Sequence, residues 1–308
     1  MPTTETRMDA RDWVLLIVLS VLWGGSFFFN GLALKELPPL TLVSLRVLLA
    51  AAILLSATLA CGLKLPSTLR DWMPFAIIAF LNNALPFSLI VIGQTYIPSG
   101  LASVINATTP LFTVLVMAAA GDETLHARRV AGVVLGLAGV VLLRGQVVDF
   151  GVDHSIGILL CLAAALSYGF AALYARRKLL QSPPLVTAAC QLMASTVMMI
   201  IVSGFAEQPW RLPIPSMTIW LAIAGLAALS TALAYVIFFQ ILRRSGSTNV
   251  MLVTLLVPIT AILLGSLVLN ETILPREIAG ALVIASALMI MDGRVISVVP
   301  RWTRGRPF

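Results

Sequence analysis

Residues 13–34, WVLLIVLSVLWGGSFFFNGLAL, decide the fold class, because this run of 22 residues contains no charged side chain. The hydrocarbon core of a bilayer is about 30 Å thick, and a helix needs roughly 20 mostly apolar residues to cross it. The run is also longer than the apolar region of about 7–15 residues in a secretory signal peptide. We therefore expect it to remain in the protein as a first transmembrane helix.

The rest of the chain has the same character. Of its 308 residues, 59% are hydrophobic and only 11% are charged, whereas a soluble domain carries about 25% charged residues. Backbone groups in hydrocarbon must be satisfied within helices or a closed barrel, and the period-two alternation of a barrel is absent. The sequence predicts an all-α membrane protein of ten transmembrane helices. The expected spans are residues 13–34, 40–61, 72–93, 97–119, 129–145, 156–176, 184–204, 216–241, 247–268 and 276–296, with a turn at Gly246 before the ninth.

The basic residues indicate how the chain is oriented. Fifteen of the 20 Lys and Arg residues fall on the side of the predicted spans that holds the N-terminus, four fall on the other side, and Arg46 lies within a span. Cytoplasmic loops of membrane proteins carry an excess of Lys and Arg. Both termini are therefore expected in the cytoplasm. The net charge of +7 reflects this topology, and we expect the lipid bilayer rather than nucleic acid as the partner.

The chain also repeats itself. An offset of 145 residues places Trp23 on Tyr168 and Arg46 on Gln191, and an offset of 148 places Phe87 on Tyr235, Pro110 on Pro258 and Glu123 on Glu271. The sequence therefore predicts two five-helix repeats, residues 1–145 and 146–308. Because five is an odd number, the second repeat enters the membrane from the opposite side, so the halves are inverted. Inverted repeats with a site between them are the architecture of many secondary transporters.

Several of these segments resemble a known family. They are LWGGSF at 22–27, Arg46, SVINATTPL at 103–111, Glu123, and the repeated VP at 257–258 with Glu271. Over residues 13–296 the chain resembles the EamA-type exporters of the drug/metabolite transporter superfamily, and among them the aromatic amino-acid exporters of the YddG type. The resemblance implies a multi-pass protein of the bacterial inner membrane that exports amino acids or other small metabolites. It also implies a central cavity lined by spans one, three, four, six, eight and nine.

Arg46 is the only charged residue well inside a predicted span. Its guanidinium could hold a substrate carboxylate through a planar pair of donors. Alternatively, it could be a structural fastener, and the matched Gln191 favours that interpretation. No Asp, Glu or His lies deep in a span, so a carboxylate relay for protons is not expected. Glu123 and Glu271 stand at helix ends, where solvated capping or pairing with Arg128 and Arg276 is favoured over a proton relay.

Other polar residues within the spans are candidates for substrate binding. Asn82 and Asn83 precede Pro86, whose missing N–H weakens the helix turn there. The fourth span carries a stripe of polar residues and a proline, Ser99, Ser103, Asn106, Pro110 and Thr113, and the ninth carries a matching stripe from Ser247 through Thr254 to Pro258. A polar face on a membrane helix is more typical of a cavity lining than of a lipid contact. Pro86, Pro110 and Pro258 are predicted kinks.

Aromatic residues complete the set of candidates. Trp23 and Tyr168 occupy matched positions in spans one and six, and Tyr235 is the partner of Phe87. These rings could stack on an aromatic or apolar substrate, or they could be ordinary packing residues.

The sequence as a whole predicts a secondary transporter for small neutral or zwitterionic metabolites, best fitted by amino acids. A transporter or flippase for another metabolite, drug or lipid is the first alternative, and an intramembrane enzyme or a channel is a remote one. Zinc-type histidine pairs, a phosphate-binding glycine loop and Ser/His constellations are absent from the sequence, so no cofactor, metal or catalytic residue is expected. Ten spans need no second subunit.

Overall fold

The computed structural model describes residues 9–123, 126–144, 152–250 and 253–292. These residues contain helices and no strand, which confirms the predicted all-α class. The α-helices are α1 (Ala10–Ala33), α2 (Pro39–Ala60), α3 (Leu69–Ala79), α4 (Leu85–Gly93), α5 (Ser99–Asn106), α6 (Thr109–Ala119), α7 (Ala127–Arg144), α8 (Val152–Lys178), α9 (Pro184–Ala206), α10 (Met217–Ala227), α11 (Ala234–Val250), α12 (Val253–Val268) and α13 (Pro275–Asp292). Two π-helices, η1 (Phe80–Ala84) and η3 (Ala228–Leu233), and a short 3-10 helix, η2 (Pro209–Arg211), complete the set.

Several of these helices form longer rods. The π-helix η1 joins α3 to α4 without a break, and η3 joins α10 to α11 in the same way. Among the described residues, seven helical rods are long and apolar enough to cross a membrane, and Arg129–Leu143 and Val253–Val268 are shorter apolar helices. The chain is therefore a multi-pass membrane protein. Polar loops and helix ends separate the apolar runs, which is why the helices begin and end close to the predicted positions.

One predicted boundary is wrong. The sequence analysis expected a turn at Gly246, but helix α11 continues through that residue to Val250. A single glycine costs a helix only about 1 kcal/mol relative to alanine, so the neighbouring residues can carry the helix past it. Ser247, expected to begin the ninth span, consequently lies in α11 rather than in α12.

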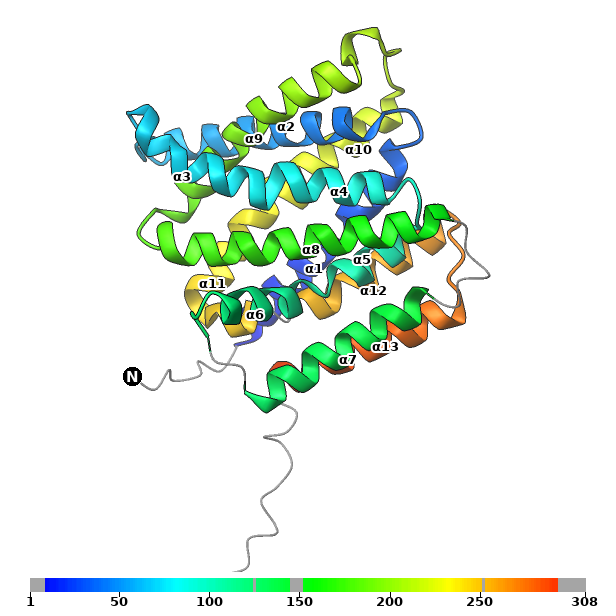
Figure 1. The fold of residues 1–308 in the computed structure, drawn as a ribbon. Helices are drawn as coiled ribbons and strands as arrows, with labels where there is room; N and C mark the ends of the chain where they lie inside the picture. The colour runs from blue at the N-terminus through cyan, green and yellow to red at the C-terminus, as the bar shows by residue number, and fades with distance from the viewer. Residues whose placement is uncertain (1–8, 124–125, 145–151, 251–252, 293–308) are drawn as a thin grey trace, which may run out of the picture.

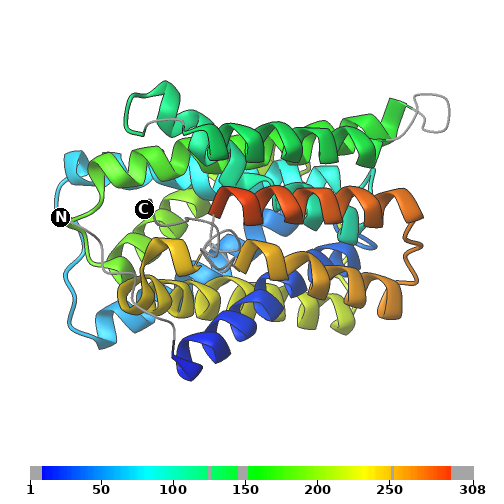
Figure 2. The same cartoon turned by 90° about the horizontal axis from the view of Figure 1, so that it is seen from below.

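The rods lie roughly side by side and their directions alternate (Figures 1 and 2). One end of the bundle, at the left of Figure 1, holds the start of α1 and the connections at residues 61–68, 120–123 and 179–183. Because most of the described basic side chains gather there, we call it the basic end. The other end holds the connections at 34–38, 94–98, 207–216 and 269–274, and we call it the far end.

Helices at matched positions of the sequence repeat pack in matched ways. Helix α2 packs on α9 along one side of the bundle, and α7 packs on α13 along the opposite side (Figure 1). Between them, α1 packs on α12, and its repeat mate α8 packs on α5 and α6. Helix α2 also reaches η3, and its mate α9 reaches η1. These last two contacts bring the π-helices into the centre of the molecule.

Candidate functional site

The two π-helices lie at repeat-related positions. An offset of 148 residues places Phe80 on Ala228 and Ala84 on Ala232, so η1 and η3 begin at equivalent residues. A π-helix widens the hydrogen-bonding turn by one residue, is rare, and is frequent at functional sites. In η1 the cause is visible, since Pro86 offers no N–H to the preceding turn. The matched residue near η3 is Ala234, so the second π-helix forms without a proline.

The widened turns present polar side chains in an apolar environment. The same offset places Asn82 on Ser230 and Asn83 on Thr231. Asn83, Ser230 and Thr231 are at most 1% exposed, and Asn82 is half-buried. The hydroxyl of Thr231 donates to the carbonyl of Leu226 at 2.8 Å, a residue five positions earlier. That bond helps to satisfy the carbonyls that a π-helix leaves out of the α-helical ladder.

Each π-helix is bonded to the second helix of the other half. Arg46 of α2 donates its Nε–H to Thr231 Oγ1 of η3 at 3.0 Å. Gln191 of α9, the residue matched to Arg46, accepts from Asn82 Nδ2 of η1 at 3.3 Å. Two crossed contacts therefore join the halves of the chain at its centre.

Tyr235 of α11 is hydrogen-bonded to both amide side chains of η1. Its hydroxyl accepts from Asn82 Nδ2 at 3.1 Å and donates to Asn83 Oδ1 at 3.4 Å. We call Arg46, Asn82, Asn83, Gln191, Thr231 and Tyr235 the central polar cluster.

An aromatic row leads away from this cluster. The ring of Tyr235 stacks on Phe239 with centroids 6.2 Å apart, Phe239 packs on Phe238 at 5.3 Å, and Phe238 packs on Trp23 at 5.5 Å. Tyr168 is half-buried where the two largest hydrophobic clusters of the bundle meet. The cluster thus offers amide and hydroxyl groups and the row beside it offers ring faces, the two kinds of group that an amphipathic small molecule can contact.

The remaining candidates from the sequence lie on other helices. Ser103 is fully buried and donates to the carbonyl of Gly100 at 2.6 Å. Asn106 ends α5, and its buried Oδ1 has no hydrogen-bond partner. Thr254 is half-buried in α12. None of the hydrogen bonds described above links these three side chains to the central polar cluster.

The predicted kinks take different forms. The helix breaks at residues 107–108, directly before Pro110 in the first turn of α6. The π-helix η1 ends directly before Leu85 and Pro86. Pro258, by contrast, lies inside α12, which continues through it.

Comparison with known proteins identifies the chain's family. The model of the EamA-like transporter family matches the chain twice, over residues 12–145 and 155–291. The chain belongs to the EamA-like transporter family. The predicted family is therefore confirmed, and the two matches make the chain a tandem repeat of one domain type.

Relatives of this EamA-like transporter span nearly its whole length. It is 28% identical to the "Uncharacterized inner membrane transporter YedA" of Escherichia coli strain K12, over 91% of the chain and 90% of the relative. It is 29% identical to the "Probable amino-acid metabolite efflux pump" of the same organism, over 92% and 95%. A solved crystal structure covers 95% of the chain with a TM-score of 0.67 and 19% identity, and it shares the fold.

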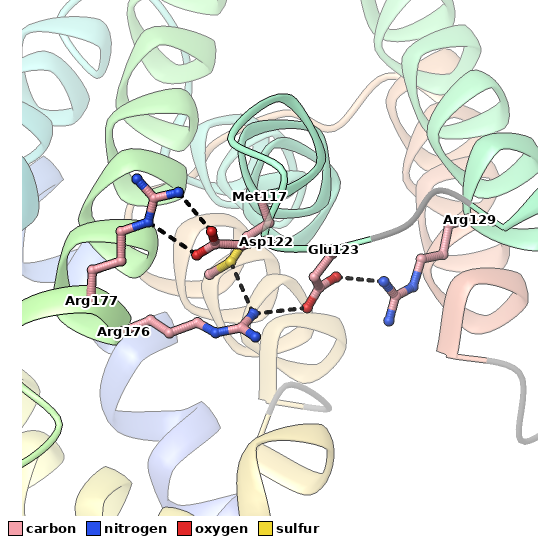
Figure 3. A network of polar contacts seen from close by, with 6 residues as sticks. All are labelled: Met117, Asp122, Glu123, Arg129, Arg176 and Arg177. Carbon is pink, nitrogen blue, oxygen red and sulfur yellow. Dashed lines mark hydrogen bonds and ion pairs between the residues drawn. The ribbon is translucent and has the colours of Figure 1, made fainter.

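Polar contacts also join helices and loops at the two ends of this EamA-like transporter. At the far end, Glu271 accepts from the backbone N–H groups of Ser99 and Gly100 at 2.9 and 3.3 Å and so caps α5. At the basic end, its repeat mate Glu123 pairs instead with Arg129 and Arg176 (Figure 3). Glu271 therefore takes the capping role favoured by the sequence analysis. Glu123 pairs with two arginines other than the expected Arg128, whose side chain lies outside the described part of the structure.

The sequence analysis did not single out two residues that contribute to the site. Thr231 was missed because single hydroxyls are common in membrane helices, although the 148-residue offset maps it onto Asn83. Phe87 was noted only as the partner of Tyr235, yet its ring lies 3.8 Å from the guanidinium carbon of Arg46. No sequence pattern predicts that contact, because the two residues lie on different helices.

Proposed function

We propose that this transporter exports small neutral or zwitterionic metabolites, amino acids including aromatic ones, by alternating access around the central polar cluster. In this proposal, ten helical rods cross the membrane as two inverted five-helix halves, 1–145 and 146–308. The directions of the rods support it, since α1 starts at the basic end whereas its mate α8 starts at the far end (Figure 1). Two related halves can rock to expose one site to either side in turn.

The observation that carries the proposal is the composition of the central polar cluster. It holds amides, a hydroxyl, a phenol and a single cation, Arg46. Substrates with several phosphate charges would call for several cationic groups. Neutral and zwitterionic molecules match this set, and the aromatic row from Tyr235 to Trp23 supplies ring faces for an aromatic side chain. A relative named as a probable amino-acid metabolite efflux pump supports the same class of substrate.

We further propose that the protein lies in a bacterial inner membrane with both termini in the cytoplasm. Most of the described basic side chains gather at the end of the bundle where α1 begins, and an excess of Lys and Arg marks the cytoplasmic side. A relative named as an inner membrane transporter supports the location. Modification of single cysteines in intact cells, at positions 62 and 213, would test the orientation.

A counterflow assay tests the function. Purified protein is reconstituted in liposomes loaded with one unlabelled amino acid, and uptake of the labelled compound is followed across a panel that includes aromatic amino acids. We expect saturable uptake that depends on the internal amino acid. Failure to exchange any member of the panel would exclude amino acids as substrates.

The variant Asn82→Ala tests the location of the site in the same assay. Asn82 bonds to both Gln191 and Tyr235, so its loss should lower counterflow several-fold. Ser56→Ala is the matched control, because the Ser56 hydroxyl is not part of the cluster and bonds only to Ala52 of its own helix at 2.9 Å. Equal losses in the two variants would argue against the cluster as the substrate site.

The driving force follows from the same residues. Since the cluster contains no carboxylate or histidine, the substrate gradient itself should suffice to drive export. Strong uptake driven by a pH gradient alone would contradict this. A lipid flippase of the same fold is the second candidate, and a lipid-scrambling assay on the same proteoliposomes separates the two.

A further inference from the structure

Arg46 is buried with most of its hydrogen-bonding capacity unused. A guanidinium carries five N–H groups, and the only hydrogen bond of Arg46 to a described residue is from Nε to Thr231. The side chain is only 6% exposed. Its two terminal nitrogens are not among the fully enclosed polar atoms, so they keep contact with accessible surface. The four N–H groups on these nitrogens therefore have no acceptor among the described residues but can be reached.

Arg46 also lacks a counter-charge. None of the ion pairs between described residues includes it, and every Asp and Glu of the sequence stands near a helix end or a loop. The face of the Phe87 ring, 3.8 Å away, supplies a weak electrostatic partner. A buried charge without an ionic partner is costly. An anionic group on the transported molecule would remove that cost.

The repeat-related contact is built differently. Gln191, matched to Arg46 by the repeat, is neutral, and its Oε1 accepts from Asn82. Asn83 offers Oδ1 to the Tyr235 hydroxyl. Amide oxygens accept hydrogen bonds and attract a cation. The amide oxygens of Gln191 and Asn83 each keep a lone pair for a further donor, whereas the terminal nitrogens of Arg46 can only donate.

We propose that Arg46 binds the carboxylate of the substrate and that this contact gives a zwitterion one fixed orientation, with its ammonium group toward the amide oxygens. The inference rests on the proposed function and deepens it, because it makes a free carboxylate a requirement for recognition. The aromatic row from Tyr235 to Phe238 then lies beside the substrate's side chain. Amines and amides of the same shape lack the group that Arg46 recognises.

Competition by two ligands, measured in the wild type and in a variant of Arg46, tests the assignment. L-phenylalanine and L-phenylalaninamide share the ring and the ammonium group and differ in the carboxylate, so each is used to compete with labelled L-phenylalanine in counterflow. In the wild type, we expect phenylalanine to compete about 10- to 100-fold better, as for loss of a hydrogen-bonded charge. In Arg46→Gln, the affinity for phenylalanine should fall to that for the amide, so that the ratio approaches one.

Arg46→Lys is the conservative variant. It keeps the charge but loses the planar pair of donors, so the preference for the carboxylate should be partly restored. If Arg46 is only a structural fastener, Arg46→Gln weakens both ligands equally and the ratio is unchanged, which would overturn the assignment.

The wild type alone decides the question if the variants do not fold. Equal competition by phenylalanine and its amide would overturn the carboxylate contact while leaving amino-acid export intact. Absence of counterflow for every amino acid would instead refute the proposed function. The two failures are therefore distinguishable.

Discussion

The two ends of the bundle are held together by different chemistry. At the far end, three glutamates bind helix N-termini of the other half. Glu207 accepts from Leu40 N, Thr41 N and Thr41 Oγ1 of α2, Glu271 accepts from the first residues of α5, and Glu36 accepts from Ser216 N and Oγ before α10. The first N–H groups of a helix have no partner within it, and a carboxylate there also meets the positive end of the helix dipole.

At the basic end, the carboxylates bind arginines. Asp122 pairs with Arg177 and Glu123 with Arg129 and Arg176 (Figure 3). Arg244 bonds to Asp9 and Asp12. The pairs of Asp122 and Glu123 are partly exposed, and ion pairs of this kind are worth about 0–1 kcal/mol each. Asp12 is different, since it is 5% exposed and also accepts from Ser245 Oγ at 2.6 Å. The far end is thus held by carboxylates that satisfy free backbone N–H groups at helix starts, whereas the loop of Asp122 and Glu123 at the basic end is held by ion pairs that water and salt weaken.

The largest effect is expected from Glu207→Ala. Glu207 Oε2 accepts from Thr41 N at 2.6 Å and from Thr41 Oγ1 at 2.7 Å, and Oε1 accepts from Leu40 N at 2.9 Å. Losing all three should destabilise the protein by about 1–3 kcal/mol. Thermal unfolding in detergent measures the change. Glu207→Gln keeps one acceptor oxygen and should fall between Ala and the wild type, and equal stability of all three proteins would contradict the importance of the cap.

A smaller effect is expected from Gly265→Ala. A Cβ added at Gly265 would overlap Glu271 Oε2, so the carboxylate must leave the N-terminus of α5, at a cost of about 1 kcal/mol. Glu271→Gln should weaken the same cap. If both act on one contact, the double variant is less destabilised than the sum of the two single changes. Additive losses in thermal unfolding would place the effect of Gly265 elsewhere.

Acid and salt should affect the stabilisation at the two ends differently. Hydrogen bonds from Ser216 lower the pKa of Glu36 from its ordinary value of 4.5, and Arg177 lowers the pKa of Asp122 from 3.8. The stabilisation that each group gives is complete above these unfolded values and is lost as the pH falls through the lowered folded pKa. Glu36→Gln and Asp122→Asn should therefore each reduce the loss of unfolding temperature at about pH 3.

Salt then distinguishes the two groups. Screening at high ionic strength weakens an exposed ion pair but has less effect on a hydrogen-bonded cap. The difference between wild type and Asp122→Asn at neutral pH should shrink in high salt, and that for Glu36→Gln should persist. Equal salt dependence would remove the distinction between the two ends.

The smallest effect is expected from Arg177→Ala. The Arg177 side chain is 47% exposed and its partner Asp122 is 20% exposed, so solvent screens the pair and the loss should stay within about 0.5 kcal/mol. Thermal unfolding against the wild type measures it. A loss as large as that of Glu207→Ala would show that the basic end is as tightly fastened as the far end.

The sequence predicted most of the fold, because a bilayer imposes helix length and apolarity. Pro110 and the turn residues near Pro38 marked real helix boundaries. Gly246 did not, since its helical neighbours outweighed its local preference. The π-helix η3 could not be predicted from the sequence, because the residue matched to Pro86 is Ala234. Its cause lies in contacts that need the folded chain, the hydrogen bonds of Thr231 with Leu226 and Arg46.

The site was predicted less completely. The repeat marked Arg46 and Gln191 as equivalents, but their partners Thr231 and Asn82 depend on how helices far apart in the sequence pack. Ser103 was selected for the polar stripe on its helix, yet its hydroxyl is satisfied by its own helix. Periodicity shows which residues share a helix face, but only packing shows which faces meet.

Protection from alkylation tests the central claim, that amino acids bind at the central polar cluster, most directly. Phe239 stacks on Tyr235 and is half-buried, so Phe239→Cys introduces a thiol beside the cluster. The natural Cys61 is exposed at the end of α2 and serves as an internal control. L-phenylalanine should slow alkylation at position 239 in a saturable manner and leave Cys61 unaffected. Unchanged alkylation at position 239, in protein that still performs phenylalanine counterflow, would contradict the account.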